Sequence, residues 1–279
     1  MRVRNYGVAL AAVAVASMTL AGCSEKKDDT IADKDKLIVG VKYDQPGLGL
    51  KSGSGAEGFD VDVAKAIAKK MGVDEKNVTF KEAKSANRES FIANGTVDMV
   101  IATYSITAAR KPKVTFGGPY IVTHQDIMVR ADDSSIKDLA SLKGKKLCAV
   151  SGSNSWKNIT DGTNKLSQKV QMETVPAQGY DDCITKLKGG AVDVVSTDAT
   201  ILAGYAGREG SSVKVVNAPF TDEKYGVGIK KGDTKGCEAV NKAIADLYKD
   251  GTMKTAWDKW FGKANLPFDA NQPQAEGCS

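Results

Sequence analysis

Polar side chains with the chemistry to hold a small charged molecule follow four apolar stretches of strand length. The apolar stretches are residues 37–41, 97–102, 146–150 and 192–196. The polar residues after them are Lys42 and Tyr43, then Thr103, Ser105 and Arg110, then Ser153 and Asn154, and last Asp198. A guanidinium holds a carboxylate through paired hydrogen bonds, and a carboxylate accepts hydrogen bonds from an ammonium group. Arg110 and Asp198 therefore have the chemistry to hold a zwitterion.

A serine-rich segment offers a second way to hold an anion. It reads Ser151-Gly152-Ser153-Asn154-Ser155 and stands at a predicted helix start. Backbone N–H groups at a helix N-terminus bind anions. In open α/β sheets, ligands bind beyond the carboxyl ends of the strands, where such loops converge. We therefore expect these polar groups to meet at one site.

The elements that must position these groups follow an α/β pattern. Apolar residues with helical spacing lie near residues 60–71, 85–93, 182–187, 235–249 and 253–261. Strands that alternate with helices are typical of α/β lobes built on largely parallel sheets.

A recurrence and the chain length both favour two lobes. Residues 92–100, IANGTVDMV, are echoed by residues 187–195, LKGGAVDVV. Each copy is typical of a helix end, a glycine and a buried strand, although a generic helix-to-strand connection would look much the same. Interruptions near residues 120–123 and 220–226 predict two crossings and thus a two-strand hinge. The first lobe is then residues 37–121 and 225–279, and the second is 122–224, a division that suits a chain of this size.

The N-terminal segment has the features of an export signal. Arg2 and Arg4 precede an apolar run over residues 8–20 that is too short to span a membrane as a helix. Leu20-Ala21-Gly22-Cys23 follows and resembles a bacterial lipobox. We expect residues 1–22 to be a lipoprotein signal peptide, Cys23 to carry the lipid anchor, and residues 23–36 to form a charged tether. The protein would then sit on the extracellular face of the cytoplasmic membrane.

The four remaining cysteines predict two disulfides. An even count in an oxidising compartment favours disulfides over a metal site, and four cysteines allow three pairings. Pairing within lobes leaves the lobes free to move, whereas pairing between lobes would lock them. We therefore predict Cys148–Cys183 and Cys237–Cys278.

The sequence lacks the residues that several classes of function need. The formal net charge is +5, but the lysines are scattered, which argues against a nucleic-acid partner. His124 is the single histidine, so Ser-His or Cys-His catalysis and zinc clusters lack residues. The glycine-rich residues 53–58 lack the Lys-Ser/Thr of a phosphate-binding loop. We expect a non-enzyme without cofactor or metal.

Five motifs, in order along the chain, carry a resemblance to a known family. They are Gly58-Phe59-Asp60-Val61-Asp62, Val97-Asp98 with Ser105-Ile106-Thr107-Ala108-Ala109-Arg110, Phe116-Gly117-Gly118-Pro119-Tyr120, Ser151-Gly152-Ser153, and Thr197-Asp198. Together they resemble the family 3 extracellular solute-binding proteins of polar amino-acid ABC transporters. The resemblance implies a type II periplasmic-binding-protein fold, a monomer that closes about its hinge, and a membrane permease as partner.

The resemblance also implies roles for individual residues. Arg110 would hold the α-carboxylate of an amino acid and Asp198 its α-ammonium group. Thr103, Ser105 and Ser153 would add hydroxyl or backbone contacts.

Specificity is where this chain departs from the commoner family pattern. Lys42-Tyr43-Asp44-Gln45-Pro46-Gly47 replaces an aromatic-rich loop and, with Asn87-Arg88-Glu89, resembles the glutamate-binding lipoproteins of high-GC Gram-positive (actinobacterial) species. By position, Lys42 and Arg88 match two cationic sites around a side-chain carboxylate, so L-glutamate is the expected ligand, with aspartate as a further candidate. The residues alone leave Arg88 open to being a solvated surface residue, and leave Tyr43 open between packing and ligand contact.

Other functions stay open at this stage. Glutamine or another polar amino acid is the first alternative. An exported enzyme acting on a small carboxylic acid is the second, because enzymes share this fold. A receptor lobe that presents an amino acid to a sensor is the third.

Overall fold

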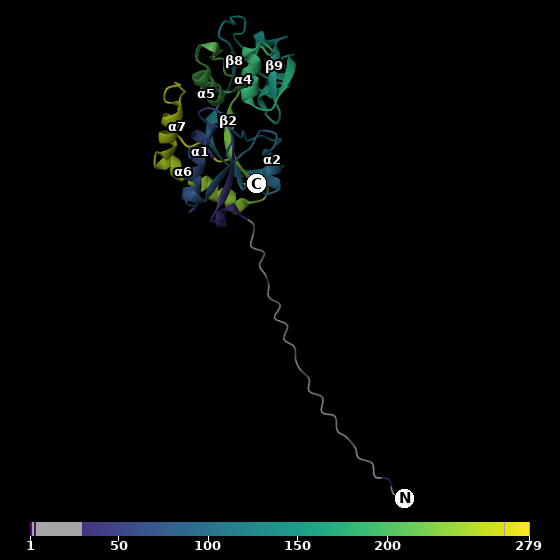
Figure 1. Ribbon diagram of the computed structural model, residues 1–279, viewed down its shortest axis with the longest axis vertical. Helices are drawn as coiled ribbons and strands as arrows, with labels where there is room; N and C mark the ends of the chain where they lie inside the picture. The colour runs from purple at the N-terminus through teal and green to yellow at the C-terminus, as the bar shows by residue number, and fades with distance from the viewer. Residues whose placement is uncertain (2, 4–29, 265, 279) are drawn as a thin grey trace.

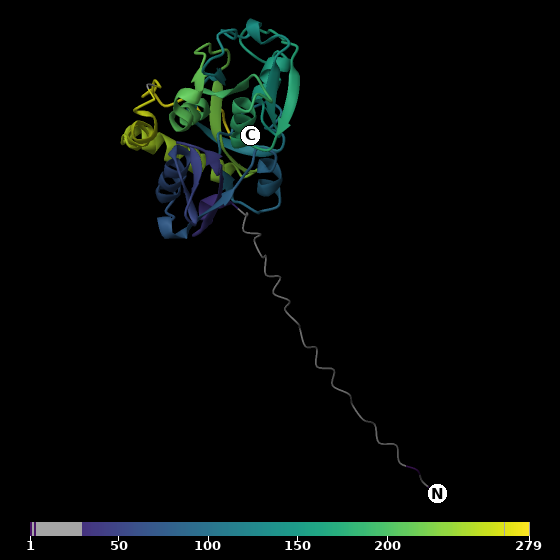
Figure 2. The ribbon, with the colours of Figure 1, turned by 45° about the horizontal axis from the view of Figure 1, so that its top comes forward.

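The computed structural model describes residues 1, 3, 30–264 and 266–278. Figures 1 and 2 show that the chain from residue 30 onward forms two α/β lobes stacked along the long axis. This arrangement confirms the predicted fold class.

The first lobe is built on a five-stranded mixed sheet. Its strands, in spatial order, are β5 (Val78–Glu82), β1 (Leu37–Val41), β6 (Met99–Val100), β13 (Glu223–Lys230) and β7 (Val114–Thr123). Strand β1 is parallel to β5 and β6, whereas β13 is antiparallel to β6 and β7. The helices of this lobe are α1 (Phe59–Lys70), α2 (Arg88–Ala93), α6 (Thr234–Lys249) and α7 (Thr252–Phe261). A small sheet connects β1 to α1 through β2 (Asp44–Gln45), β3 (Gly49–Ser52) and β4 (Gly55–Glu57).

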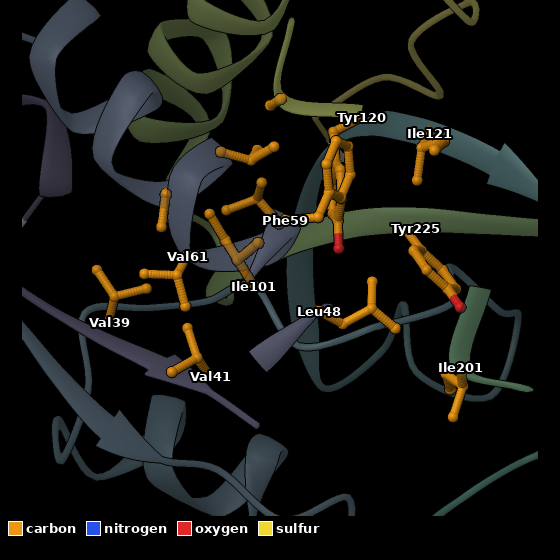
Figure 3. Close-up of a cluster of buried hydrophobic side chains, with 14 of the residues drawn as sticks. Val39, Val41, Leu48, Phe59, Val61, Ile101, Tyr120, Ile121, Ile201 and Tyr225 are labelled. Atoms are coloured by element: carbon orange, nitrogen blue, oxygen red, sulfur yellow. The ribbon is translucent and has the colours of Figure 1, made fainter. Parts of the chain in front are cut away.

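Helix α1 forms because its apolar residues repeat with helical spacing. Phe59, Val63 and Ile67 are buried along one face of the helix. The ring of Phe59 meets Trp257 of α7 edge to face, with ring centroids 5.5 Å apart. Figure 3 shows Phe59 near Tyr120 of β7, so this core fixes the start of α1 against the sheet.

The second lobe contains two smaller sheets. Strand β8 (Gln125–Arg130) lies between β11 (Val195–Asp198) and β12 (Val213–Val215) and is antiparallel to both. Strand β9 (Lys146–Val150) is parallel to β10 (Glu173–Ala177), and a bridge from Leu147 to Val194 joins the two sheets. The helices are α3 (Ser155–Thr160), α4 (Tyr180–Lys188) and α5 (Ala199–Glu209). Short 3-10 helices over both lobes are η1 (Ile31–Asp33), η2 (Glu75–Asn77), η3 (Ala140–Leu142) and η4 (Gly210–Ser212).

Two neighbouring segments connect the lobes. Strands β7 and β13 pair until Thr123 stands opposite Glu223, and β8 begins at Gln125. The backbone N–H of Gln125 donates to Oγ1 of Thr221 at 3.0 Å, so the two crossings are hydrogen-bonded to each other. Thr123, Thr221 and Glu223 lie in the segments near residues 120–123 and 220–226 that the sequence pattern assigns to crossings, and Gln125 lies just beyond the first of them.

Each disulfide stays within one lobe. Cys148 of β9 is bonded to Cys183 of α4, and Cys237 of α6 is bonded to Cys278 near the C-terminus. These are the two pairings predicted from the sequence. Neither bond restrains one lobe against the other.

Two strand predictions need correction. Residues 97–102 contain only the two-residue strand β6, although the N–H of Ile101 still donates to the carbonyl of Gly40 at 2.9 Å. The strand predicted at residues 192–196 runs instead from Val195 to Asp198, because Val194 is used by the bridge to Leu147.

Residues 30–36, which the sequence assigns to the tether, lie in the folded part of the chain. Ile31 is 3% exposed and belongs to the core of the first lobe. Thr30 Oγ1 donates to Asp233 Oδ1 at 2.6 Å. Residues 30–36 therefore belong to the folded lobe, because an apolar residue and a hydrogen bond hold them there.

The predicted export signal falls almost wholly outside the described residues. Residues 2 and 4–22 and the predicted lipidation site, Cys23, are among those that the structure does not describe. Within the described residues, no helix is long and apolar enough to cross a membrane.

Candidate functional site

A small cavity, here called the interlobe cavity, lies where the two lobes meet. Its volume is about 10 Å³, close to the space of one water molecule. The first lobe contributes Ser85, Arg88, Thr103, Ser105 and Arg110 to its wall. The second lobe contributes Ser153, Asn154, Ser155, Tyr180, Thr197, Asp198 and Ile201. All of these except Ile201 are polar or charged, so the cavity suits a small polar solute.

Arg110 is buried and reaches from the first lobe to the second. Its Nη1 donates to the carbonyl of Ser105 at 2.8 Å, and its Nη2 donates to the carbonyl of Gly152 at 3.1 Å. Its Nε lies 3.7 Å from Oε1 of Glu89, and its guanidinium stacks 4.9 Å from the ring centroid of Tyr104. These contacts fix the guanidinium plane at the cavity wall.

Arg88 begins α2 and is a second buried cation at the same wall. Its Nη1 donates to the carbonyl of Ala102 at 3.0 Å and its Nη2 to that of Gly152 at 3.3 Å. Its Nε is buried without a hydrogen-bond partner among the described residues. Burial, followed by the nearby charge of Arg110, lowers the pKa of Arg88 to about 10. An anion in the cavity would offset the desolvation of Arg88 and its repulsion from Arg110.

Lys42 lies behind the cavity wall rather than in it. Its Nζ donates to Oγ of Ser85 at 2.8 Å, and Ser85 is the residue that faces the cavity. Burial, followed by the charge of Arg88, lowers the pKa of Lys42 well below its ordinary value. Lys42 therefore acts on the cavity through Ser85 and through its charge.

Tyr43 does not reach the cavity, which corrects its prediction as a ligand contact. Its hydroxyl donates to the carbonyl of Phe80 at 3.1 Å, and its ring packs at the edge of the core. Nζ of Lys42 reaches Ser85 at the cavity wall, whereas the hydroxyl of Tyr43 reaches the backbone of Phe80.

Thr103 is held in an unusual backbone conformation at the first-lobe wall. Its φ is 45°, a left-handed value that is uncommon for a β-branched residue. Its N–H donates to Oδ2 of Asp60 at 2.9 Å, while Oδ1 of Asp60 accepts from the hydroxyl of Tyr120 at 2.8 Å. Burial raises the pKa of Asp60 to about 6. Asp60 thus anchors the strand end from which Thr103 lines the cavity.

The second-lobe wall is a chain of hydroxyl groups at the start of α3. Ser153 Oγ accepts from the N–H of Ser155 at 3.1 Å and lies 3.0 Å from the hydroxyl of Tyr180. Ser155 Oγ lies 3.3 Å from Oγ1 of Thr197. Asn154 precedes α3 and is half-buried. Hydroxyl groups rotate to donate or accept, so this wall adapts to a bound solute.

Asp198 supplies the carboxylate of the second lobe, at the start of α5. Its Oδ2 accepts from the hydroxyl of Tyr225 at 2.6 Å, and its Oδ1 is buried with no hydrogen-bond partner among the described residues. Burial, followed by the charge of Glu223, raises the pKa of Asp198 well above its ordinary value. A cationic group beside Oδ1 would supply the missing partner.

The structure brings most of the predicted ligand residues together. Those that line the cavity are Arg88, Thr103, Ser105, Arg110, Ser153, Asn154 and Asp198. Sequence reasoning missed Ser85, Ser155, Tyr180, Thr197 and Ile201 as lining residues. Ser155 and Thr197 stand in motifs already singled out, whereas Tyr180 starts a helix after an edge strand that carries no apolar signal. His124 lies at the first crossing and does not line the cavity.

The described residues offer no candidate metal centre. They contain no group of three or more His, Cys, Asp or Glu side chains placed to hold a metal ion. The chemistry of the interlobe cavity is that of a binding site with cations on one wall and a carboxylate on the other.

The chain is similar to several known amino-acid-binding proteins. Glutamate-binding protein GluB of Corynebacterium glutamicum is 40% identical over 96% of this chain and 94% of its own length. The glutamine-binding protein GlnH of an ABC transporter of Bacillus subtilis is 38% identical over 85% of this chain and 86% of its own. A solved structure of an ancestral arginine-binding protein bound to glutamine is 35% identical, with a TM-score of 0.74 over 82% of this chain and 99% of that one. This structural match supports the predicted type II binding-protein fold.

A family model also matches, over residues 37–263, and it spans both lobes and every residue of the interlobe cavity. The chain belongs to the bacterial extracellular solute-binding proteins, family 3.

Proposed function

We propose that this protein binds L-glutamate in the interlobe cavity and delivers it to the permease of an ABC importer. The observation that carries the proposal is a group of three buried cations, Lys42, Arg88 and Arg110. Among the described residues, neither Lys42 nor Arg88 forms a salt bridge, and the nearest carboxylate of Arg110 is at 3.7 Å. Buried cations without paired anions favour an anionic ligand.

The charges of glutamate match the two walls. Arg110, with a fork of donors at the cavity wall, suits the α-carboxylate, and the unpartnered Oδ1 of Asp198 suits the α-ammonium group. Arg88, with its unpartnered Nε, and Lys42 behind Ser85 suit the side-chain carboxylate. The ligand would then neutralise groups from both lobes at once.

Glutamine is the second candidate, because relatives bind it. GlnH is a glutamine-binding protein, and the ancestral arginine-binding protein was solved with glutamine. The second buried cation at the first-lobe wall favours glutamate, since a neutral amide would leave Arg88 without an anion. Aspartate has the same charges on a shorter side chain and is expected to bind less tightly.

Binding requires the lobes to open and close. A cavity of about 10 Å³ is far smaller than an amino acid, so the solute enters only when the lobes separate at the two crossings. The solute then favours the closed form by contacts that exist only there. We propose that this closed form docks on the permease, that the protein works as a monomer tethered by lipid at Cys23, and that it binds the solute without chemical turnover.

Isothermal titration calorimetry with glutamate, aspartate, glutamine, asparagine and arginine tests the proposal. We expect glutamate to bind most tightly and to be recovered unchanged after incubation. Equal affinity for glutamate and glutamine would refute the role given to the cations. Consumption of the amino acid would refute binding without turnover.

A further inference from the structure

A loop of the first lobe contacts two helices of the second lobe, outside the interlobe cavity. This loop consists of the short strand β2 and Pro46, residues 44–46, and it meets the start of α4 and the middle of α5. The hydroxyl of Tyr205 on α5 donates to the backbone carbonyl of Asp44. None of residues 44–46 lines the interlobe cavity.

The loop supplies a cap that α4 lacks in its own lobe. The N-cap residue of α4 is Gly179, which has no side chain to accept from the first N–H groups of the helix. Oδ2 of Asp44 accepts from the N–H of Tyr180 at 2.9 Å, across 136 residues of chain. A Cβ at position 179 would lie 2.3 Å from that same Oδ2. The glycine therefore makes room for a carboxylate that comes from the other lobe.

The second contact depends on a glycine inside a helix. Gly204 lies in the interior of α5, where glycine is less favourable than alanine. A Cβ at position 204 would lie 1.9 Å from the carbonyl oxygen of Pro46. One turn further along α5, Gly207 is exposed, and a Cβ added there would have no atom within 4 Å.

We propose that residues 44–46, Gly179 and Gly204 form a closure latch, and that they are positioning residues that set the affinity for every solute by one common factor. The latch exists only when the lobes meet, so it stabilises the closed form. Apparent affinity scales with the population of the closed, binding-competent form. Because none of these residues lines the cavity, we expect the ratio of affinities for two solutes to stay unchanged.

The start of α4 links the latch to the site. Tyr180, whose N–H is capped by Asp44, places its hydroxyl against Ser153 and Ser155 at the cavity wall. Closure of the latch therefore coincides with placement of the second-lobe hydroxyl groups.

The first test compares Gly204→Ala with Gly207→Ala in the full chain. Both changes replace a helical glycine, so each is expected to raise the melting temperature without solute, by about 2–4 °C for Gly207→Ala. Only Gly204→Ala adds a methyl group against Pro46. We expect it to weaken binding of glutamate and of glutamine about tenfold each, with the ratio of the two unchanged. Gly207→Ala should bind as the wild type does.

The second test uses the cap. Asp44→Ala should weaken binding of both amino acids roughly fivefold, the effect of removing a helix N-cap, and Asp44→Asn should restore most of it because Asn also caps helices. The control is Asp182→Ala, which removes a carboxylate from the same first turn of α4 that pairs with Lys186 inside the second lobe. That control should leave affinity unchanged.

The solute readout rests on the proposed function, so a readout without solute is included. Small-angle X-ray scattering of the solute-free proteins should give a larger radius of gyration for Gly204→Ala than for Gly207→Ala. Equal radii, equal affinities of the two glycine variants, or a changed glutamate-to-glutamine ratio would each overturn the latch. If the wild type binds no amino acid, the proposed function fails and the scattering comparison alone decides the latch.

Discussion

Arg110 and Gly152 are hydrogen-bonded across the two lobes, with 3.1 Å between Nη2 and the carbonyl oxygen. Arg88 donates to the same oxygen at 3.3 Å, so two cations share one neutral acceptor. A Cβ at Gly152 would lie 2.5 Å from the carbonyl oxygen of Ser85, which shows how closely the two backbones meet here. A charged oxygen accepts more strongly than a neutral carbonyl, so a carboxylate has the advantage over Gly152 for these donors.

Replacement of Arg110 tests the shared role of this guanidinium. Arg110→Ala should abolish measurable binding of glutamate and glutamine alike, a loss of about 2–5 kcal/mol or more for a buried charge pair. Arg110→Lys should bind weakly, because a lysine keeps the charge and loses the two-pronged geometry. Calorimetry at equal protein concentrations measures both. Unchanged glutamine affinity in Arg110→Ala would remove Arg110 from the α-carboxylate.

Arg88→Gln tests the distal cation. We expect a loss of about 2–5 kcal/mol for glutamate, whose side-chain carboxylate would lose a buried partner, and a much smaller loss for glutamine. The glutamine side chain at position 88 keeps an amide donor and carries no charge. Arg130→Gln is the control, since Arg130 donates to carbonyls within the second lobe at Leu187 and Val192. Equal losses for both amino acids would place Arg88 outside the distal part of the site.

The raised pKa of Asp198 predicts a pH dependence of binding. In the solute-free protein, burial and then the charge of Glu223 favour the protonated carboxyl of Asp198 more strongly than Arg110 and Arg88 oppose it. The ammonium group of a solute favours the ionised form, so binding releases a proton. Affinity should therefore rise with pH until the pKa of Asp198 in the solute-free protein is passed, and then level off.

Calorimetry in buffers of different ionisation enthalpy measures the proton release. Asp198→Asn should bind more weakly and lose this pH dependence. Glu223→Gln should move the inflection to lower pH, because it removes a charge that raises the pKa of Asp198. An inflection that stays in place in Asp198→Asn would assign the pH dependence to another group.

The sequence predicts best those residues that follow a buried strand. Arg110 and Asp198 were found because the carboxyl ends of apolar strands converge at one edge, and that rule needs no knowledge of packing. Tyr180 was missed because β10 before it is an edge strand, with exposed polar residues and Pro176 in place of an apolar run. Lys42 was placed in the cavity wall, although its side chain stops at Ser85, because sequence spacing does not show which of two polar residues lies in front.

Contacts between the lobes could not be predicted from the sequence pattern. Gly204 looks like an ordinary helix position in the sequence, and its approach to Pro46 depends on how two separately folded lobes meet. The long strands β7 and β13 were predicted only as crossings, because the glycines and Pro119 in β7 interrupt the periodic pattern. The two strands form because each pairs with the other, and neither sequence indicates that pairing by itself.

Because the Cys148–Cys183 disulfide lies within one lobe, we expect its removal to lower stability and to leave binding almost unchanged. It ties β9 to α4 within the second lobe over a sequence separation of 35 residues. Replacing both cysteines with alanine should lower the free energy of unfolding by about 3–4 kcal/mol, mainly because the unfolded chain is no longer cross-linked. Denaturant unfolding measures this loss. Glutamate affinity at a temperature where the variant is folded should stay within about twofold, because ligand closure changes the angle between lobes and this bond lies inside one of them. A much larger loss of affinity in the folded variant would show that the bond also holds Tyr180 in place at the cavity wall, and would contradict the separation.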